Sequence, residues 1–320
     1  MSFSGYSLLP LESLELRFLM EAINGSSQQL RNLYQEAVFT NVANKVINVQ
    51  DSSGHSALHL AVQKGNIELS ELIIQFGADV NTATNANSAN NEGNTPLIEA
   101  SSHGYVAIVK ILLENDAKVD ASMKDGTHAA FQAAKNGHLQ ALKLLTEKNQ
   151  NIAHLKGEEG RTPLTMAARN GHLEIVEYLT SLPNVKVDAK DNFGNHAANF
   201  AAHHGRLVIL MLLIQKDPNV ADLKGYLGRT PLSTAAESGK LDINEFLTSR
   251  RNVTMNSHDD YGATALILAT ANYHPKIVQL LLEKGVNLSV KDDNLKWAID
   301  LAMEKGHTDV IKLFTKSKEH

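Results

Sequence analysis

The fold of this 320-residue chain is decided by one phrase, Gly160-Arg-Thr-Pro-Leu-Thr-Met-Ala-Ala-Arg-Asn-Gly-His172. The first glycine opens a turn. Thr162 and Pro163 then begin a helix, because a threonine hydroxyl caps free backbone amides and proline loses no needed donor in the first helical turn. Small alanines lie on one face of that helix, and Gly-His ends it. The phrase therefore predicts a turn followed by a short helix that packs closely against its neighbours.

The same phrase recurs along the chain, and the residue equivalent to Thr162 defines a cap position in each copy. The cap positions are Ser56, Thr95, His128, Thr162, His196, Thr230, Thr264 and Trp297. Six of the seven gaps between them are 33 or 34 residues, and one is 39. A fixed period of this length indicates a stacked-repeat protein. The long gap falls on residues 82–92, which are small, polar and rich in asparagine, and we interpret them as a lengthened surface loop.

Each copy predicts a first helix, a tight turn, a second helix and a loop, and the two ends of the array depart from this plan. Residues 1–50 lack the phrase but carry helical apolar spacing at 11–24 and 28–39, which predicts a helical N-terminal cap. The copy at Trp297 is degenerate, as expected of a C-terminal capping repeat. We therefore predict two regions, a cap at residues 1–50 and a repeat array at 51–320.

Composition narrows the function classes. The chain is 43% apolar, carries a net charge of −5 and contains no cysteine, which excludes disulfides, thiol catalysis and thiolate zinc sites. Acidic and basic residues are interleaved, so the charge does not point to nucleic acid. No run approaches the ~20 apolar residues that span a bilayer, and the N-terminus is unlike a conventional signal peptide. We expect a soluble, cytoplasmic monomer without membrane insertion.

Taken together, these copies resemble the ankyrin repeat. The resemblance rests on the Thr-Pro-Leu, Ala-Ala, Gly-His and Leu-Leu elements and on Gly77-Ala-Asp-Val-Asn81, and it covers about residues 51–315. It implies an all-α ankyrin solenoid of about eight repeats with β-turn tips. It also implies that tips and first helices line a concave face that binds another protein without catalysis.

The histidines do not indicate a catalytic or metal site. His138, His172 and His307 follow a turn glycine as the repeat requires, and His128 and His196 stand at cap positions two repeats apart. At the family's ~10 Å per repeat that separation is ~20 Å, too far to share a metal ion at ~2.1 Å. No phosphate loop or catalytic triad departs from the repeat pattern. We predict no catalytic residue, metal or cofactor, although an unrecognised enzyme or enzyme regulator remains an alternative.

Partner contact is predicted at the variable positions of repeats four to seven. Aromatic and apolar residues are absent from the first four tips and present on the next three, and an exposed row of this kind favours an interface. The alternative is that each ring packs on its own turn and stabilises it. A mildly basic patch near the tips, formed by Lys124, Lys135, Arg161 and Arg169, would meet an acidic segment or be ordinary solvated surface. The predicted partner-binding residues are Arg161, Arg169, Phe193, His203, His204, Tyr226, Leu227, Arg229 and Tyr261.

Two further hypotheses concern the biological setting. The segment Leu9-Pro-Leu-Glu12, followed by Leu14 and Phe18, faintly resembles the opening of an F-box, which would make residues 8–40 a ubiquitin-ligase adaptor. The asparagine- and lysine-rich composition without cysteine favours a bacterial source. An effector secreted into a host cell is therefore a second hypothesis.

Overall fold

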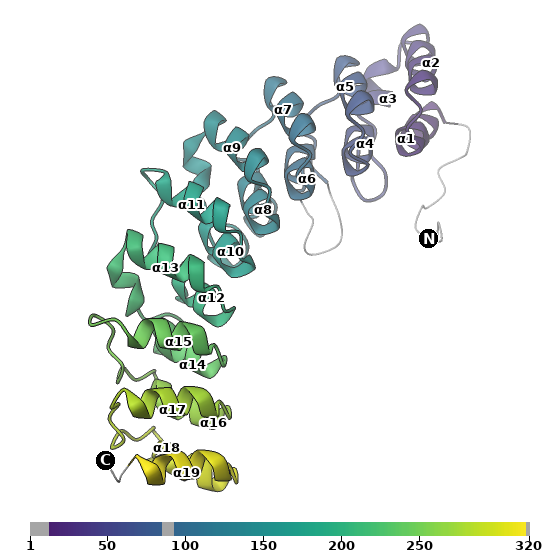
Figure 1. The fold of residues 1–320 in the computed structure, drawn as a ribbon. Coiled ribbons are helices and arrows are strands. Elements are labelled where there is room, and N and C mark those ends of the chain that lie inside the picture. The colour runs from purple at the N-terminus through teal and green to yellow at the C-terminus, as the bar shows by residue number, and fades with distance from the viewer. Residues whose placement is uncertain (1–12, 85–92, 318–320) are drawn as a thin grey trace. The chain divides into compact units, whose positions relative to one another are not determined.

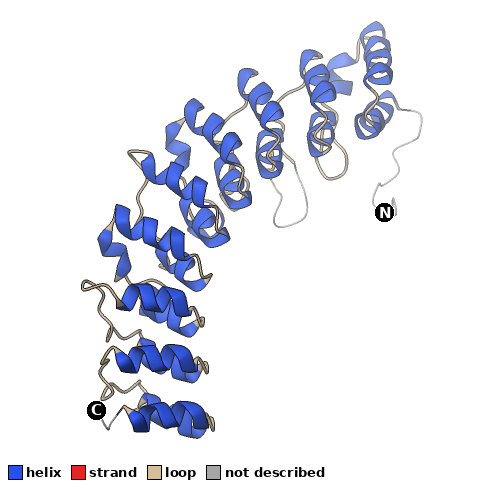
Figure 2. Ribbon diagram, in the orientation of Figure 1, coloured by secondary structure: helices blue, strands red, loops and turns tan. Residues whose placement is uncertain are grey.

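The computed structural model describes residues 13–84 and 93–317, and within these ranges the chain is built from helices and turns without strands (Figures 1 and 2). The all-α prediction is confirmed. The F-box-like segment at residues 9–12 and most of the asparagine-rich segment lie outside the described residues.

The chain divides into two compact units, one ending at Glu158 and the other beginning at Glu159. Unit 1 begins with α1 (Leu14–Asn24), α2 (Ser27–Phe39) and α3 (Ala43–Ile47). Its repeats are α4 (Ala57–Gln63) with α5 (Ile67–Gln75), α6 (Pro96–His103) with α7 (Val106–Glu114), and α8 (Ala129–Asn136) with α9 (Leu139–Lys148). A 3-10 turn, η1 (Gln150–Ala153), follows α9, and η2 (Glu158–Gly160) forms the next tip.

Unit 2 carries repeats four to eight. Its helix pairs are α10 (Pro163–Asn170) with α11 (Leu173–Ser181), α12 (Ala197–His203) with α13 (Leu207–Lys216), α14 (Pro231–Glu237) with α15 (Leu241–Thr248), α16 (Ala265–Ala271) with α17 (Pro275–Glu283), and α18 (Ala298–Glu304) with α19 (Thr308–Lys316). The 3-10 turns η3 (Pro218–Ala221) and η4 (Tyr226–Gly228) lie between α13 and α14. With the three pairs of unit 1, these five pairs give the eight predicted repeats.

The cap positions begin the first helices as predicted. The Thr162 hydroxyl accepts a hydrogen bond from the Thr165 amide at 3.2 Å, which satisfies one free donor of the first turn. His128 performs the same task with its imidazole, since Nδ1 accepts from the Phe131 amide at 3.4 Å. Glycine in the left-handed conformation ends α10, with φ of 90° at Gly171.

Within each unit, the first helices of successive repeats pack against one another, for example α12 against α14 and α14 against α16 (Figure 1). Alanine makes this close approach possible, and Ala198, Ala201 and Ala235 are completely buried. In the second helices the Leu-Leu pairs are buried to different extents. Leu213 and Leu281 have no exposed surface, whereas Leu212 and Leu280 are partly exposed. In α7 both Leu112 and Leu113 are buried.

The described part of the N-terminal region is helical and has one more helix than the sequence predicted. Helix α1 packs on α2 and on α4 of the first repeat and buries Phe18 and Leu19. The unpredicted α3 is only five residues long and buries Val46 and Ile47. Its shortness explains why no helical period was visible at residues 43–47.

Two buried histidines are expected to make the protein acid-sensitive. His59 and His196 have no exposed surface, and burial is the main cause that lowers the pKa of each to about 4. Each ring hydrogen-bonds a carbonyl oxygen of the next repeat, His59 Nε2 to Asn94 at 3.1 Å and His196 Nε2 to Leu223 at 3.0 Å. The unfolded chain takes up these protons near pH 6.5, so stability is present above that pH and falls as the pH drops toward 4.

At pH 5 the expected loss is about 2 kcal/mol for each of these two histidines. Urea unfolding at pH 7 and pH 5 measures it. A His59→Gln, His196→Gln variant should lose less stability between the two pH values than the wild type does. The exposed His154 provides the control substitution, His154→Gln. An equal pH dependence in the double variant would contradict the assignment.

Candidate functional site

The tips of repeats five and seven are held by an aspartate. Asp191 Oδ1 accepts hydrogen bonds from the backbone amides of Phe193 at 2.9 Å and Asn195 at 2.8 Å. Asp259 Oδ1 accepts equivalent bonds from Tyr261 and Ala263, both at 2.9 Å. These local bonds compete with other backbone pairings and fix the turn. They leave the Phe193 and Tyr261 side chains at the surface.

The tips of repeats four and six use glycine instead. Gly157 and Gly225 take the place of the aspartate, and the turns are the 3-10 segments η2 and η4. Leu227 lies in η4 with a left-handed backbone, φ 56°. Its carbonyl accepts a hydrogen bond from the Asp260 amide at 2.9 Å, and its side chain is partly buried. Leu227 therefore positions the next tip through its backbone.

Arg161 and Arg229 connect each glycine tip to the aspartate tip that follows. Arg229 Nε donates to Asp259 Oδ2 at 3.2 Å, and its Nη1 donates to Glu237 at 2.7 Å. Arg161 forms ion pairs with Glu159 and, at 3.7 Å, with Asp191. The arginine side chains are only 14% and 18% exposed. Both predicted contact residues thus hold neighbouring repeats together, and little of either guanidinium is free for a partner.

The predicted aromatic row is partly paired. The rings of Phe193 and Tyr226 meet edge to face with centroids 6.2 Å apart. Even so, Phe193 is 49%, Tyr226 48% and Tyr261 55% exposed. The ring contact agrees with a role in stabilising the turns, and the exposed halves agree with a role in binding. The predicted partner contact stays a prediction.

A groove of about 300 Å³ lies beside these tips, between repeats five and six. Its shape follows from residue size at one repeat position, four residues after the cap position. Phe200 and Leu268 occupy that position in repeats five and seven, whereas repeat six has the smaller Thr234. Thr234 lines the groove together with Phe200 and Tyr226, and its small side chain leaves more space there than a phenylalanine or leucine would. The groove is lined by Asn195, Asn199, Phe200, His203, Tyr226, Arg229, Thr234 and Glu237.

Hydrogen bonds hold the walls of the groove in place. Asn195 Oδ1 accepts from the Tyr226 amide at 3.0 Å, and Asn199 Nδ2 donates to the Arg229 carbonyl at 3.2 Å. His203 Nδ1 lies 2.8 Å from the Ser238 hydroxyl. Because these contacts link repeat five to repeat six, the groove is formed before any ligand arrives.

His203 and His204 lie next to the groove, close to the cationic side chains of Arg169, Arg206 and Lys240. Their rings meet edge to face with centroids 4.8 Å apart. Burial, together with the nearby charges of His203, Arg169, Arg206 and Lys240, lowers the pKa of His204 to about 4. We call Arg169, His203, His204, Arg206 and Lys240 the basic cluster.

The basic cluster differs from the patch suggested by Lys124, Lys135, Arg161 and Arg169 in the sequence. Lys135 pairs with Glu158 at 3.6 Å, and Arg161 is held by its own acids. Arg206 and Lys240 were missed because they occupy the position where other repeats carry the structural histidines that follow the turn glycine. Comparing the residues that follow the turn glycine in each repeat would have found Arg206 and Lys240. Comparing the residues four places after each cap position would likewise have identified Thr234 as a small side chain.

The described residues contain no group of three or more histidine, aspartate and glutamate side chains that could hold a metal ion. None of the helices in residues 13–84 and 93–317 is long and apolar enough to cross a membrane.

Comparison with known proteins agrees with the repeat architecture. The sequence matches the family described as ankyrin repeats (3 copies) in four overlapping segments, residues 19–123, 117–191, 180–257 and 245–320. Among relatives, it is 29% identical over 104 residues to human ankyrin repeat domain-containing protein 63, covering 31% of this chain and 26% of that protein. It is 35% identical over 112 residues to rat protein phosphatase 1 regulatory subunit 12A, covering 35% of this chain and 10% of that protein.

A third relative is the mouse B-cell lymphoma 3 protein homolog, 32% identical over 118 residues, which are 37% of this chain and 25% of that protein. These alignments thus cover only about a quarter or less of each relative. The family match, in contrast, extends from residue 19 to residue 320. With the eight helix pairs and their capped turns, it shows that the chain belongs to the ankyrin-repeat family.

Proposed function

We propose that this chain binds a protein partner through the inner face of unit 2, the surface formed by the tips and first helices of repeats four to seven. The observation that carries the proposal is the combination of half-exposed rings at Phe193, Tyr226 and Tyr261 with a preformed groove beside them. Interfaces derive most of their energy from a few aromatic and arginine anchors that enter pockets. Ankyrin repeats generally mediate protein-protein interaction, which agrees with this assignment.

The mechanism is recognition by a rigid surface. Arg229 and Asn199 fix the tips against the helices, so partner binding orders few additional groups. The proposed role is non-catalytic, and the chain acts as a monomer. Binding to an enzyme in order to regulate it would use the same surface.

Affinity capture followed by hydrogen-deuterium exchange tests the proposal. The full chain is used as bait, captured proteins are identified by mass spectrometry, and exchange is compared between the free chain and the purified complex. The partner should slow exchange at the tip backbone amides around Phe193, Tyr226 and Tyr261. The tips of unit 1 at Ser53 and Asp125 are the internal control and should be unaffected. Protection confined to unit 1 would overturn the proposal.

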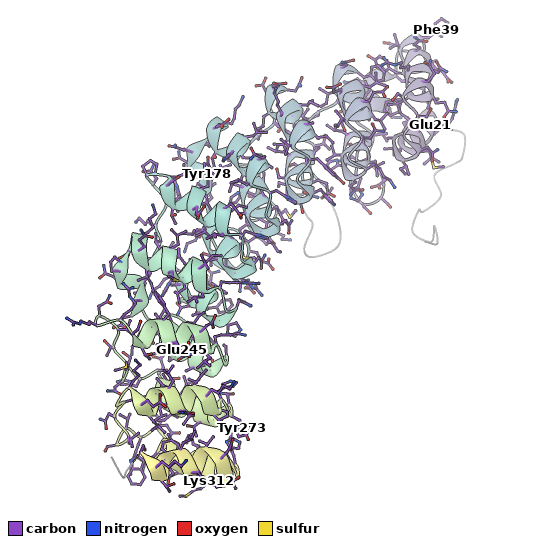
Figure 3. All side chains as sticks on the ribbon, viewed as in Figure 1. Glu21, Phe39, Tyr178, Glu245, Tyr273 and Lys312 are labelled. Atoms are coloured by element: carbon purple, nitrogen blue, oxygen red, sulfur yellow. The ribbon has the colours of Figure 1, made fainter. Side chains whose placement is uncertain are left out.

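The same experiment addresses the ligase-adaptor function of residues 8–40. One observation favours a second contact there: Phe39, at the end of α2, is 92% exposed, and the neighbouring Val38 and Val42 are 53% and 37% exposed (Figure 3). Protection of α2 and α3 by a ligase subunit would support the adaptor function. Within residues 13–40, α1 packs on α2 and on α4 of the first repeat.

The hypothesis of a secreted bacterial effector in the host cytoplasm rests on composition alone. Appearance of the chain in host cytosol that depends on a secretion system would support it, and its absence there would count against it.

A further inference from the structure

The groove between repeats five and six has room for one bulky amino-acid side chain. Its volume of about 300 Å³ lies at the lower limit of small-molecule pockets, which are about 300–1,000 Å³. Phe200 and Tyr226 contribute aromatic rings to its lining. Glu237, the acid in the lining, is bound by Arg229 at 2.7 Å. The groove therefore favours a bulky apolar side chain over a charged one.

The basic cluster next to the groove has an unbalanced charge. Arg161 and Arg229 pair with the nearby acids Glu159, Asp191, Glu237 and Asp259. Within the described residues, neither Arg169 nor Lys240 forms an ion pair, and Arg206 donates its Nε to the Arg169 carbonyl at 3.4 Å. Beside the burial of His204, the positive charges of Arg169, Arg206 and Lys240 lower the pKa of its ring. A positive surface thus forms on a chain whose net charge is −5.

The groove and the basic cluster are adjacent. His203 lines the groove and stacks edge to face on His204 of the cluster. The Arg169 guanidinium lies 6.0 Å from the centroid of the Phe200 ring, which forms a groove wall. One extended segment can therefore reach both features at once.

We propose that the groove and the basic cluster together bind an acidic segment of the partner protein, with one bulky apolar side chain in the groove and neighbouring carboxylates against Arg169, Arg206 and Lys240. This inference rests on the proposed protein-binding function and specifies the chemistry of its partner. Charge complementarity selects the acidic segment, and the groove selects the apolar residue within it.

A synthetic peptide tests this chemistry directly. The probe is a fluorescein-labelled nine-residue peptide with one phenylalanine flanked by two acidic residues on each side, titrated against the full chain at low and physiological salt. Binding should saturate, weaken with salt because the cluster is exposed, and fall at least about tenfold when the peptide phenylalanine is alanine. A peptide with lysines in place of the acids should not bind.

Two variants locate the contact. Thr234→Leu fills the groove with a larger side chain. Leucine is chosen because repeat seven carries it at the equivalent position, Leu268, so the repeat fold accommodates it. Its control is Gln132→Leu, at the same repeat position in unit 1. Arg169→Gln, Lys240→Gln removes the unpaired cations, and its control is Lys276→Gln, Lys284→Gln on the exposed ends of α17. Each test variant should weaken the peptide at least about tenfold at low salt, and each control less than about twofold.

Absence of saturable binding, or equal binding by wild type and both test variants, would overturn the inference. A single-stranded oligonucleotide of equal charge that binds as tightly as the peptide would also overturn it, in favour of general polyanion recognition. The proposed function is tested independently by hydrogen-deuterium exchange. It is refuted if the captured partner does not slow exchange at the unit 2 tips. Partner protection at these tips without peptide binding would refute only the acidic-segment chemistry.

Discussion

A Phe193→Ala, Tyr226→Ala, Tyr261→Ala variant is expected to bind its partner at least about 100-fold more weakly than the wild type while keeping its helical content. Each ring is about half exposed, so an interface would bury the remaining half. Truncating an aromatic anchor in a binding interface costs about 2 kcal/mol or more, and three anchors do not add fully. The measurement is titration of the captured partner, with circular dichroism to monitor folding.

The outcome separates the two interpretations of the aromatic row. Phe39→Ala is the matched control, because this ring is 92% exposed and lies on α2 of unit 1 (Figure 3). If the triple variant loses helical content, the rings serve mainly to stabilise their turns. Unchanged affinity in a folded triple variant would remove the tips from the interface. Loss of binding in Phe39→Ala instead would direct attention to the N-terminal helices.

The second large effect concerns stability. Asp259→Ala is expected to lower the free energy of unfolding of unit 2 by about 3–5 kcal/mol, since removing one partner of a buried ion pair leaves the other charge uncompensated. The Asp259 side chain is 1% exposed. It accepts two tip amides through Oδ1 and Arg229 Nε through Oδ2. Urea unfolding followed by circular dichroism measures the loss.

Asp292→Ala isolates the contribution of the arginine. Asp292 occupies the equivalent position in repeat eight, and its Oδ1 accepts the amides of Asn294 and Lys296, both at 2.9 Å. No arginine pairs with it in the described part of the chain. We expect this variant to lose only about 1–3 kcal/mol, the cost of unmade hydrogen bonds. Equal losses in the two variants would mean that the Arg229 pair contributes nothing measurable.

These ion pairs also show that the tip arrangement recurs every second repeat. Arg161 and Arg229 are 68 residues apart, as are their partners Asp191 and Asp259, and so are Gly157 and Gly225. Repeats four and five therefore share one tip arrangement with repeats six and seven. The difference lies at the end of the first helix, where Arg229 neutralises Glu237 but the equivalent residue in repeat four is the cation Arg169. That single charge reversal leaves Arg169 available to the basic cluster.

The sequence by itself determined the repeat, its helices and the ends of those helices. Thr162, Pro163 and Gly171 act within about ten residues, through capping, a fixed φ and a left-handed turn, so local chemistry is enough to predict them. The period of 34 then implied stacking, because one helix pair cannot bury its apolar face alone. The row of aromatic residues at the tips could also be recognised in the sequence, because the repeat period gives the equivalent tip position in each copy.

Only the tertiary structure decided which variable side chains are free. Arg161 and Arg229 look like exposed tip residues in the sequence, but stacking brings each to an aspartate 30 residues away, and the resulting ion pairs bury them. Thr234 has no distinguishing feature in the sequence, but in the structure it lines the groove with Phe200 and Tyr226, where a small side chain leaves space. Such contacts join different repeats, so they depend on side-chain directions that only stacking establishes. The period defines where the surface lies, and the packing between repeats decides its chemistry.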